Sequence, residues 1–310
     1  MDPMNNLLTQ HLELFFGECT AAVGRIYARL PGEAVAGGAT QPIQRFRLSG
    51  TIAGPQSRYA HTLSANIPLN ARASNEAWLL EGAVPDPCFW TPDEPYLYQV
   101  TCQLSEASDS GDTTAEQASI AFGFRPLGAR GSSLYLAGKR WVPRGWIGES
   151  AIATGVTGAH QAVVAIGSST GWSEALLADA AAVGALAVQL VSHEIDAAQL
   201  QATMLGHQPA VGLVAFDANH TSPNSHYKYG NAVLAQWLRQ PPPWQLAPWA
   251  QAIVVELSDI DTLTAARQLQ LPVIVYRPHT SAQTASQARS ACDQLQREAS
   301  AYGDFAGYFV

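Results

Sequence analysis

Residues 85–98 read PDPCFWTPDEPYLY, a stretch in which four prolines alternate with aromatic residues. Pro92 and Pro95 fix their own backbone dihedral φ and disfavour a helix before them, so they set the path of the chain ahead of a strand. Trp90, Tyr96 and Tyr98 are large aromatic residues of the kind that fill cores and domain interfaces. The stretch therefore predicts a strand that starts near Tyr96 and follows a loop stiffened by proline.

On both sides of this stretch, up to about residue 130, short segments alternate between apolar and polar residues. Turn-forming pairs such as Pro31-Gly32 and Gly54-Pro55 separate them. Such alternation is typical of β-strands that bury one face. Seven short strands at this spacing predict an immunoglobulin-like β-sandwich over residues 1–130. The predicted strands are 12–16, 24–30, 44–49, 61–67, 76–84, 96–104 and 118–124.

After Gly131 the pattern changes to apolar strands that alternate with helices, which predicts a parallel α/β domain over residues 131–310. Ser173 is a typical N-cap and Gly184 a typical helix-ending glycine. Periodicity alone fits both an open doubly wound sheet and a (β/α) barrel. Strands are predicted at 141–146, 162–167, 185–191, 211–216, 253–257, 272–276 and 305–310, and helices at 173–184, 196–205, 227–239, 261–270 and 282–302.

A second stretch selects between these two folds. Residues 122–125 read FGFR, and residues 134–145 read LYLAGKRWVPRG. Together with residues 85–98, they resemble the LWSPExPxLY and xGFRxI…LxLNGxxxxxRG motifs of glycoside hydrolase family 2. The resemblance continues through residues 178–194 and 207–219, so it covers most of the chain. It implies an immunoglobulin-like sandwich followed by a TIM-type barrel.

The catalytic residues of that family are not matched. In family 2, the glutamate of an Asn-Glu pair just past the fourth strand is the general acid/base, and a glutamate just past the seventh strand is the nucleophile. Aligned on the family, Ala218 and Asn219 occupy the Asn-Glu positions. The expected seventh strand, 305–310, ends with the chain, and the segment after Pro143 is shorter than the ~200–250 residues of a complete barrel. The resemblance therefore implies a truncated, catalytically degenerate relative (a pseudoenzyme) with an incomplete barrel of about seven strands.

Charge and cysteine content exclude other classes of protein. Seventeen basic and 25 acidic residues give a net charge of −8, so no nucleic-acid partner is expected. No run of about 18 apolar residues occurs, so no membrane span is expected. The start MDPMNNLLTQ lacks the basic and apolar regions of a secretory signal, which predicts a cytoplasmic protein. Its four cysteines are expected to be reduced, mostly buried thiols, with a Cys88–Cys102 disulfide as the alternative.

Candidate site residues lie at the C-terminal ends of the predicted barrel strands, where this fold places its functional groups. No cofactor is expected, because the sequence has no G-x-G-x-x-G or Walker A motif. His193, Asp217 and His220 have side chains of metal-ligand type, but their spacing matches no recognised metal motif, so no metal is expected. The candidate ligand-binding residues are Glu149, His193, Glu194, Asp217, Asn219 and Asp259.

Three functions follow as hypotheses. The first is a binding or scaffold protein without glycosidase activity, with carbohydrate as the first candidate ligand. The second is a surviving hydrolase that uses a relocated carboxylate pair among Glu149, Glu194, Asp217 and Asp259. The third is a structural assembly protein. Self-association is also expected, because a seven-stranded barrel leaves strands 141–146 and 305–310 with open edges, and only 14% of residues are charged.

Overall fold

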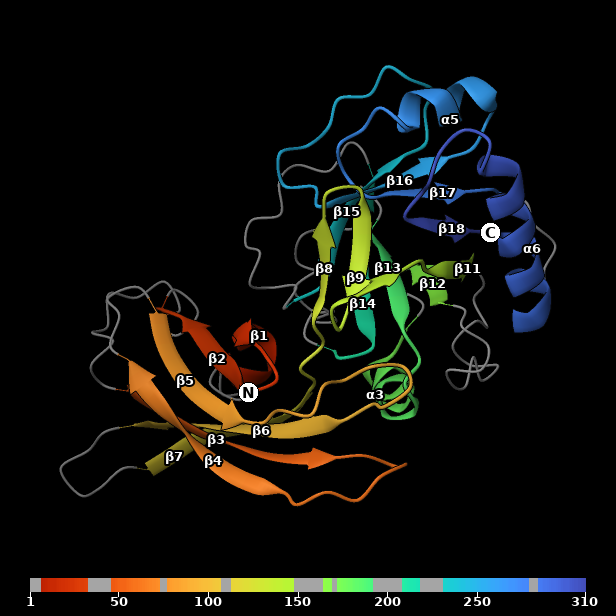
Figure 1. Ribbon diagram of the computed structural model, residues 1–310. Helices are drawn as coiled ribbons and strands as arrows, with labels where there is room; N and C mark the ends of the chain where they lie inside the picture. Colours follow the sequence, from red (N-terminus) through yellow and green to blue (C-terminus); the bar gives the residue numbers. More distant parts are fainter. Residues whose placement is uncertain are drawn as a thin grey trace. The chain divides into compact units, whose positions relative to one another are not determined.

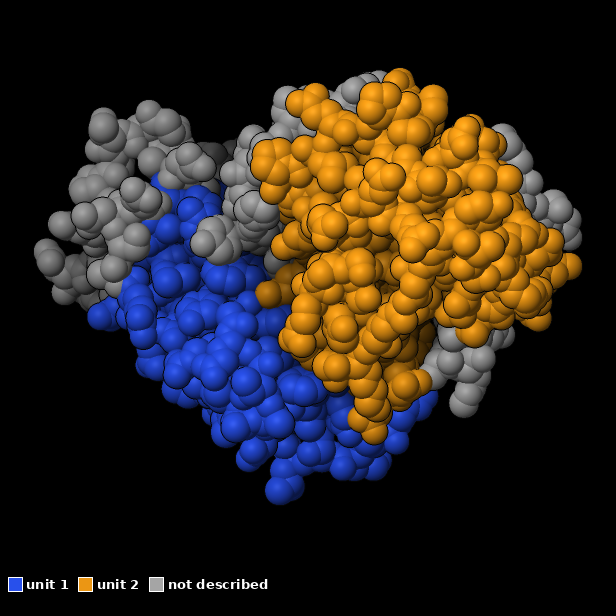
Figure 2. Space-filling view, turned by 45° about the horizontal axis from the view of Figure 1, so that its top comes forward, with its two compact units in different colours: residues 1–89, 96–124 blue, residues 90–95, 125–310 orange. Residues whose placement is uncertain are grey.

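The computed structural model describes residues 7–32, 46–72, 77–106, 113–147, 164–168, 172–191, 208–217, 231–278 and 284–310. Contacts divide the chain into two compact units, shown in blue and orange in Figure 2. The first unit contains residues 1–89 and 96–124, and the second contains residues 90–95 and 125–310. Residues 90–95 therefore belong to the second unit, although the chain on both sides of them belongs to the first.

The first unit is an antiparallel, curled, sandwich-like sheet, which confirms the predicted architecture (Figure 1). Its strand order is β1-β2-β5-β4-β3-β6-β7. Strand β4 pairs with β3 over residues 65–69 and with β5 over residues 70–72, so it joins the two halves of the sheet. The elements are α1 (Leu7–His11), β1 (Glu13–Cys19), β2 (Val23–Pro31), β3 (Phe46–Gln56), β4 (Ala65–Arg72), β5 (Ala77–Pro85), β6 (Leu97–Glu106) and β7 (Thr113–Phe122).

Alternation in the sequence gives the sandwich its core. Along β2, Ile26, Ala28 and Leu30 are fully buried, while the residues between them are partly exposed. The ring of Phe124 packs edge-to-face against Phe122 and Tyr98, with centroids 5.2 Å apart in each pair. These residues come from the two stretches that predicted the fold, which explains why those stretches carry the signal.

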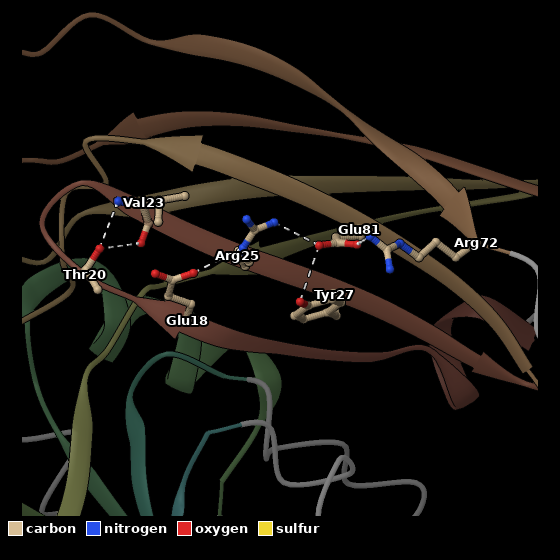
Figure 3. A network of polar contacts seen from close by, with 7 residues as sticks. All are labelled: Glu18, Thr20, Val23, Arg25, Tyr27, Arg72 and Glu81. Atoms are coloured by element: carbon tan, nitrogen blue, oxygen red, sulfur yellow. Dashed lines mark hydrogen bonds and ion pairs between the residues drawn. The ribbon is translucent and has the colours of Figure 1, made fainter.

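A network of ion pairs covers part of the sandwich surface (Figure 3). Arg25 on β2 contacts Glu18 at 3.3 Å and Glu81 at 3.2 Å. Arg72 binds the other carboxylate oxygen of Glu81 at 2.6 Å. The hydroxyl of Tyr27 also lies 3.5 Å from Glu81. The network thus connects β1, β2, β4 and β5, and its members contact one another, so it is a structural feature.

The second unit begins with a small antiparallel sheet and continues as a closed parallel barrel (Figure 1). Its helices include α6, which packs against β11 and β18. The small sheet contains β8 (Leu127–Arg130), β9 (Ser133–Leu136) and β10 (Lys139–Trp141). The barrel contains β11 (Arg144–Ile147), β12 (Val164–Ser168), β13 (Ala187–Val191), β14 (Val211–Asp217), β15 (Val233–Leu238), β16 (Ala252–Glu256), β17 (Val273–Tyr276) and β18 (Gly307–Phe309), with helices α3 (Glu174–Val183), α5 (Ile260–Ala266) and α6 (Ala285–Ala299).

The barrel agrees with the predicted TIM type, but it has eight strands where seven were predicted. The additional strand is β15, which lies within the segment 227–239 that was predicted to be a helix. All six residues of β15 (VLAQWL) are buried. A fully buried strand and a buried helix both show a continuous apolar run, so periodicity does not separate them. The outer ring of helices departs from a regular TIM barrel, since residues 239–251 join β15 to β16 without a helix.

Closure of the barrel changes the argument for self-association. The first strand, β11, pairs with the last, β18, through Gly145 and Phe309, and each strand has a second neighbour as well. Neither strand has an open edge, so the structural reason given for a dimer is wrong. Self-association itself stays a prediction that rests on the low charge alone.

Helix α6 is fixed to β11 by polar contacts within the second unit. Arg144 donates to Asp293 at 2.6 Å and to Gln296 at 2.5 Å. The thiol of Cys292 lies 3.5 Å from the carbonyl oxygen of Gly145. Arg144, part of the motif that resembles family 2, therefore holds a helix against the first barrel strand.

All four cysteines are free thiols, which contradicts the alternative of a Cys88–Cys102 disulfide. Cys102 and Cys292 are buried, whereas Cys19 and Cys88 are half-buried. Burial raises the pKa of Cys102 and of Cys292 to about 12, which keeps both thiols protonated at neutral pH. Across the described ranges, no helix has the length and apolar character needed to cross a membrane.

Helix α3 starts and ends as predicted. Ser173 accepts a hydrogen bond from the backbone N–H of Leu176, and Gly184 ends the helix with a left-handed φ of 76°. A Cβ on Gly184 would lie closer than 3.0 Å to the carbonyl oxygen of Pro92. This close approach explains how residues 90–95 pack into the second unit.

We expect Gly184→Ala to lower the free energy of unfolding by about 2 kcal/mol or more, since it adds a steric clash to an unfavourable φ. Gly138→Ala is the matched control. Gly138 has the same φ of 76°, but no heavy atom lies within 4 Å of the position that a Cβ would take there. Urea denaturation of both variants separates the two effects. Equal losses of stability in the two variants would show that the approach to Pro92 is unimportant.

Candidate functional site

The interior face of the barrel can be assigned from contacts of β14 and β15. The ring of Phe216 meets Trp249 edge-on with centroids 5.3 Å apart, and Gln236 hydrogen-bonds to the backbone of Gln245 and Ala247. Trp249, Gln245 and Ala247 belong to the connection between two adjacent strands of a closed barrel, which runs outside it. Phe216 and Gln236 therefore face outward. Because neighbouring residues of a strand point to opposite sides, Asp217 and Trp237 face the interior.

Four consecutive strands bring a group of polar and aromatic side chains to the C-terminal end of the barrel. The rings of Trp237 and Tyr276 contact each other edge-on, with centroids 5.0 Å apart and an angle of 72°. Tyr276 pairs in register with Glu256, and Trp237 pairs with Asp217. Arg239, just after β15, places its guanidinium 5.6 Å from the centroid of Trp237. We call Asp217, Trp237, Arg239, Glu256 and Tyr276 the mouth cluster.

The members of the mouth cluster differ in exposure. Trp237 is buried, with 3% of its surface exposed. Asp217, Glu256 and Tyr276 are half-buried, and Arg239 is exposed. The cluster therefore combines the buried indole of Trp237, the exposed guanidinium of Arg239 and two half-buried carboxylates. Such a mixture of polar and aromatic groups can orient a small ligand.

The indole N–H of Trp237 has no acceptor among the residues that the structure describes. A buried N–H without a partner destabilises a fold by about 1–3 kcal/mol, so such groups are rare unless something binds them. The N–H lies on the same side chain that contacts Tyr276, on the interior face. A ligand hydroxyl or carbonyl oxygen would supply the missing acceptor.

The Tyr276 hydroxyl is protonated at neutral pH. Burial raises the pKa of Tyr276, the carboxylate of Glu256 raises it further, and the guanidinium of Arg239 opposes them. A protonated phenol can donate one hydrogen bond and accept others. The mouth cluster thus combines donors on Trp237, Arg239 and Tyr276 with acceptors on Glu256 and Asp217.

Two of the candidate residues from the sequence are described by the structure, and of these two Asp217 lies in the mouth cluster. Asp259 instead caps α5, where its Oδ1 accepts from the backbone N–H and the hydroxyl of Thr262, both at 2.8 Å. These bonds favour the carboxylate form and lower the pKa of Asp259. The other candidates, Glu149, His193, Glu194 and Asn219, lie outside the described residues, as does His220.

Sequence reasoning missed the other four members of the mouth cluster. Trp237 and Arg239 were assigned to a helix, which hid their position at a strand end. Glu256 and Tyr276 fell within predicted strands, and their place at the end of those strands was the available signal. Within the described ranges, no three His, Cys, Asp or Glu side chains are close enough together to hold a metal ion.

Comparison with known proteins agrees with the two-part architecture. The sequence model of the family described as Glycosyl hydrolases family 2 matches residues 28–125. Among curated proteins, none matches the chain. Three solved structures illustrate the similarity in fold over nearly the whole chain.

A β-glucuronidase of Bacteroides uniformis superposes with a TM-score of 0.58 at 13% identity, over 96% of this chain and 45% of that chain. A family 2 glycosyl hydrolase of Bacteroides cellulosilyticus gives 0.57 at 13% identity, over 97% and 45%. A β-glucuronidase of Bifidobacterium dentium, solved with coumarin-3-O-glucuronide, gives 0.57 at 12%, over 96% and 59%. This chain therefore spans about half the length of the solved structures it resembles.

Proposed function

We propose that this chain, a relative of glycoside hydrolase family 2, binds carbohydrate at the mouth of its barrel and does not hydrolyse glycosides. The observation that carries the proposal is the unpaired N–H of buried Trp237, which lies beside Tyr276 on the interior face. Sugars present closely spaced hydroxyl groups, which both donate and accept hydrogen bonds. The mouth cluster offers partners of both kinds.

The residues at the strand ends support the absence of hydrolysis. Counting from β11, β14 is the fourth strand of the barrel and β17 is the seventh. Asp217 at the end of β14 is followed by Ala218 and Asn219, and an amide has no titratable proton to give to a leaving group.

The nucleophile position moves because the barrel has eight strands. The segment 305–310, first expected to be the seventh strand, contains the eighth. The position past the true seventh strand therefore exists in the chain, at Arg277-Pro278-His279. None of these residues is a carboxylate, so the family's nucleophile has no counterpart there. The proposed loss of hydrolysis therefore rests on residues 277–279, and no longer on the end of segment 305–310.

A second function is favoured by one specific observation. Asp217 and Glu256 both belong to the interior face, at the ends of β14 and β16. Two carboxylates that converge on one ligand can hydrolyse a glycoside if their separation is about 5–10 Å. A hydrolase with a relocated pair is therefore the alternative, and it predicts turnover that depends on both residues.

The proposal is tested with the best sugar from a glycan array, measured by titration calorimetry. Trp237→Phe keeps the ring contact with Tyr276 but removes the N–H. We expect its affinity for the sugar to fall about 5–10-fold, the effect of one hydrogen bond. Trp244→Phe is the matched control, because its N–H already donates to the carbonyl oxygen of Gln240 at 2.7 Å. Unchanged affinity in Trp237→Phe would remove the main support for this site.

A further inference from the structure

Arg125 is a buried cation far along the chain from the mouth cluster. Only 3% of its surface is exposed, and its Nη1 donates to the carbonyl oxygen of Pro209, just before β14 begins. Its guanidinium lies 5.9 Å from the ring centroid of Trp90, which is itself fully buried. Since the mouth cluster is at the other end of β14, Arg125 belongs to a separate place in the barrel unit.

The charge of Arg125 has no counter-ion in the described part of the chain. No Asp or Glu there forms an ion pair with it, and its Nε has no hydrogen-bond partner among the same residues. Burial alone lowers the pKa of Arg125 to about 9, so the side chain is still a cation at neutral pH. Leaving a buried cation without a partner is strongly unfavourable, which makes this arginine unusual.

The edge of Arg125 that contains Nε has the geometry that suits a carboxylate. Nη1 donates to Pro209, and Nε has no partner among the described residues. In every guanidinium, Nε and Nη2 lie side by side and point N–H groups in parallel. This edge of a guanidinium binds both oxygens of a carboxylate through two hydrogen bonds. A water molecule would satisfy the N–H group but would leave the charge uncompensated.

A second unpaired polar atom occurs next to Pro209. Gln208 is buried, with 4% of its surface exposed, and its Oε1 has no donor among the described residues. The ends of an amide exchange places by rotation about the last torsion of the side chain, so Gln208 can also present N–H groups. Arg125 and Gln208, the residue before its hydrogen-bond partner Pro209, therefore each have a buried side-chain atom without a partner among the described residues.

We propose that Arg125 holds a small carboxylate ion, of the size of formate or acetate, through its Nε and Nη2 edge. Trp90 is fully buried and Arg125 nearly so, which favours a ligand of only a few atoms over a larger one. The ion neutralises the guanidinium and completes its hydrogen bonds, so it stabilises the fold at the N-terminal end of the barrel strands. This site is independent of the proposed carbohydrate site.

The test compares thermal unfolding in sodium formate and in sodium chloride at equal ionic strength. We expect formate at about 100 times its dissociation constant to raise the Tm of the full chain by roughly 5 °C over chloride. Arg125→Met should lose this difference. Arg125→Lys keeps the charge without the paired N–H groups and should bind formate at least about 10-fold more weakly.

Arg130→Met is the matched control, because Arg130 also stacks on an aromatic ring, that of Tyr135 at 5.4 Å, but is exposed. It should keep the response to formate. A rise that is equal in formate and chloride, or that survives Arg125→Met, overturns the proposal. If Arg125→Met does not fold, equilibrium dialysis of labelled formate against the wild-type chain decides. One formate per chain, displaced by acetate, supports the site, and no saturable binding overturns it.

Discussion

Purified protein is expected to release no nitrophenol from any nitrophenyl glycoside above the rate in buffer. General acid–base catalysis contributes about 10²–10⁴-fold to such reactions, and covalent catalysis adds further powers of ten. In the positions where family 2 places these two glutamates, this chain has Asn219 and the sequence Arg277-Pro278-His279. The panel should include β-glucuronides and β-galactosides, and the measurement is nitrophenol absorbance over hours at several pH values.

Two variants make this expectation decisive. Asp217→Asn and Glu256→Gln remove the charge of each mouth carboxylate with little change in volume. Turnover in the wild type that either variant abolishes would contradict the account and would establish the relocated pair of the alternative function. Turnover that both variants retain at the same level would be assigned to a contaminating enzyme, which further purification removes.

Gly145→Val is expected to lower the free energy of unfolding by about 3 kcal/mol, because it adds atoms at the joint between the first and last barrel strands. A Cβ on Gly145 would lie closer than 3.0 Å to the side chains of both Phe309 and Ile166. Both neighbours are fully buried and have no free space to move into. The expected fall in Tm is roughly 6 °C, measured by calorimetry.

Gly128→Val provides the control for the loss of a glycine. Gly128 lies in β8, and no heavy atom is within 4 Å of the position its Cβ would take. We expect its Tm to change by only about 1–2 °C, as for other substitutions away from packed features. A Gly145→Val protein as stable as the wild type would show that β11 and β18 do not pack as described.

Much of the fold could be predicted because its signals are local. Alternating burial in β2, the aromatic residues near Trp90, and the caps Ser173 and Gly184 each follow from short-range sequence patterns. Strand β15 could not be predicted in the same way, since VLAQWL is buried on both faces and only its pairing with β14 and β16 makes it a strand. Because β15 was missed, the segment 305–310 was counted as the seventh strand of the barrel instead of the eighth.

The candidate site was harder to predict, because it depends on how strands are staggered around the barrel. Asp217 was found, since a charged residue directly after an apolar run marks a strand end. The contact between Trp237 and Tyr276 joins strands that are not adjacent, and no sequence pattern predicts it. Asp259 was misjudged for a local reason: an acidic residue three positions before a helix threonine is well suited to cap that helix.

The most direct test of the central claim is calorimetric titration of the wild-type chain with the sugar that binds it most strongly on a glycan array. Mass spectrometry then measures the sugar recovered from the sample cell of the calorimeter. The account predicts saturable binding of one sugar per chain, with the sugar recovered at its original mass. Absence of saturable binding to every sugar on the array would contradict the proposed carbohydrate site. Binding followed by recovery of a cleaved sugar would contradict the proposed loss of hydrolysis.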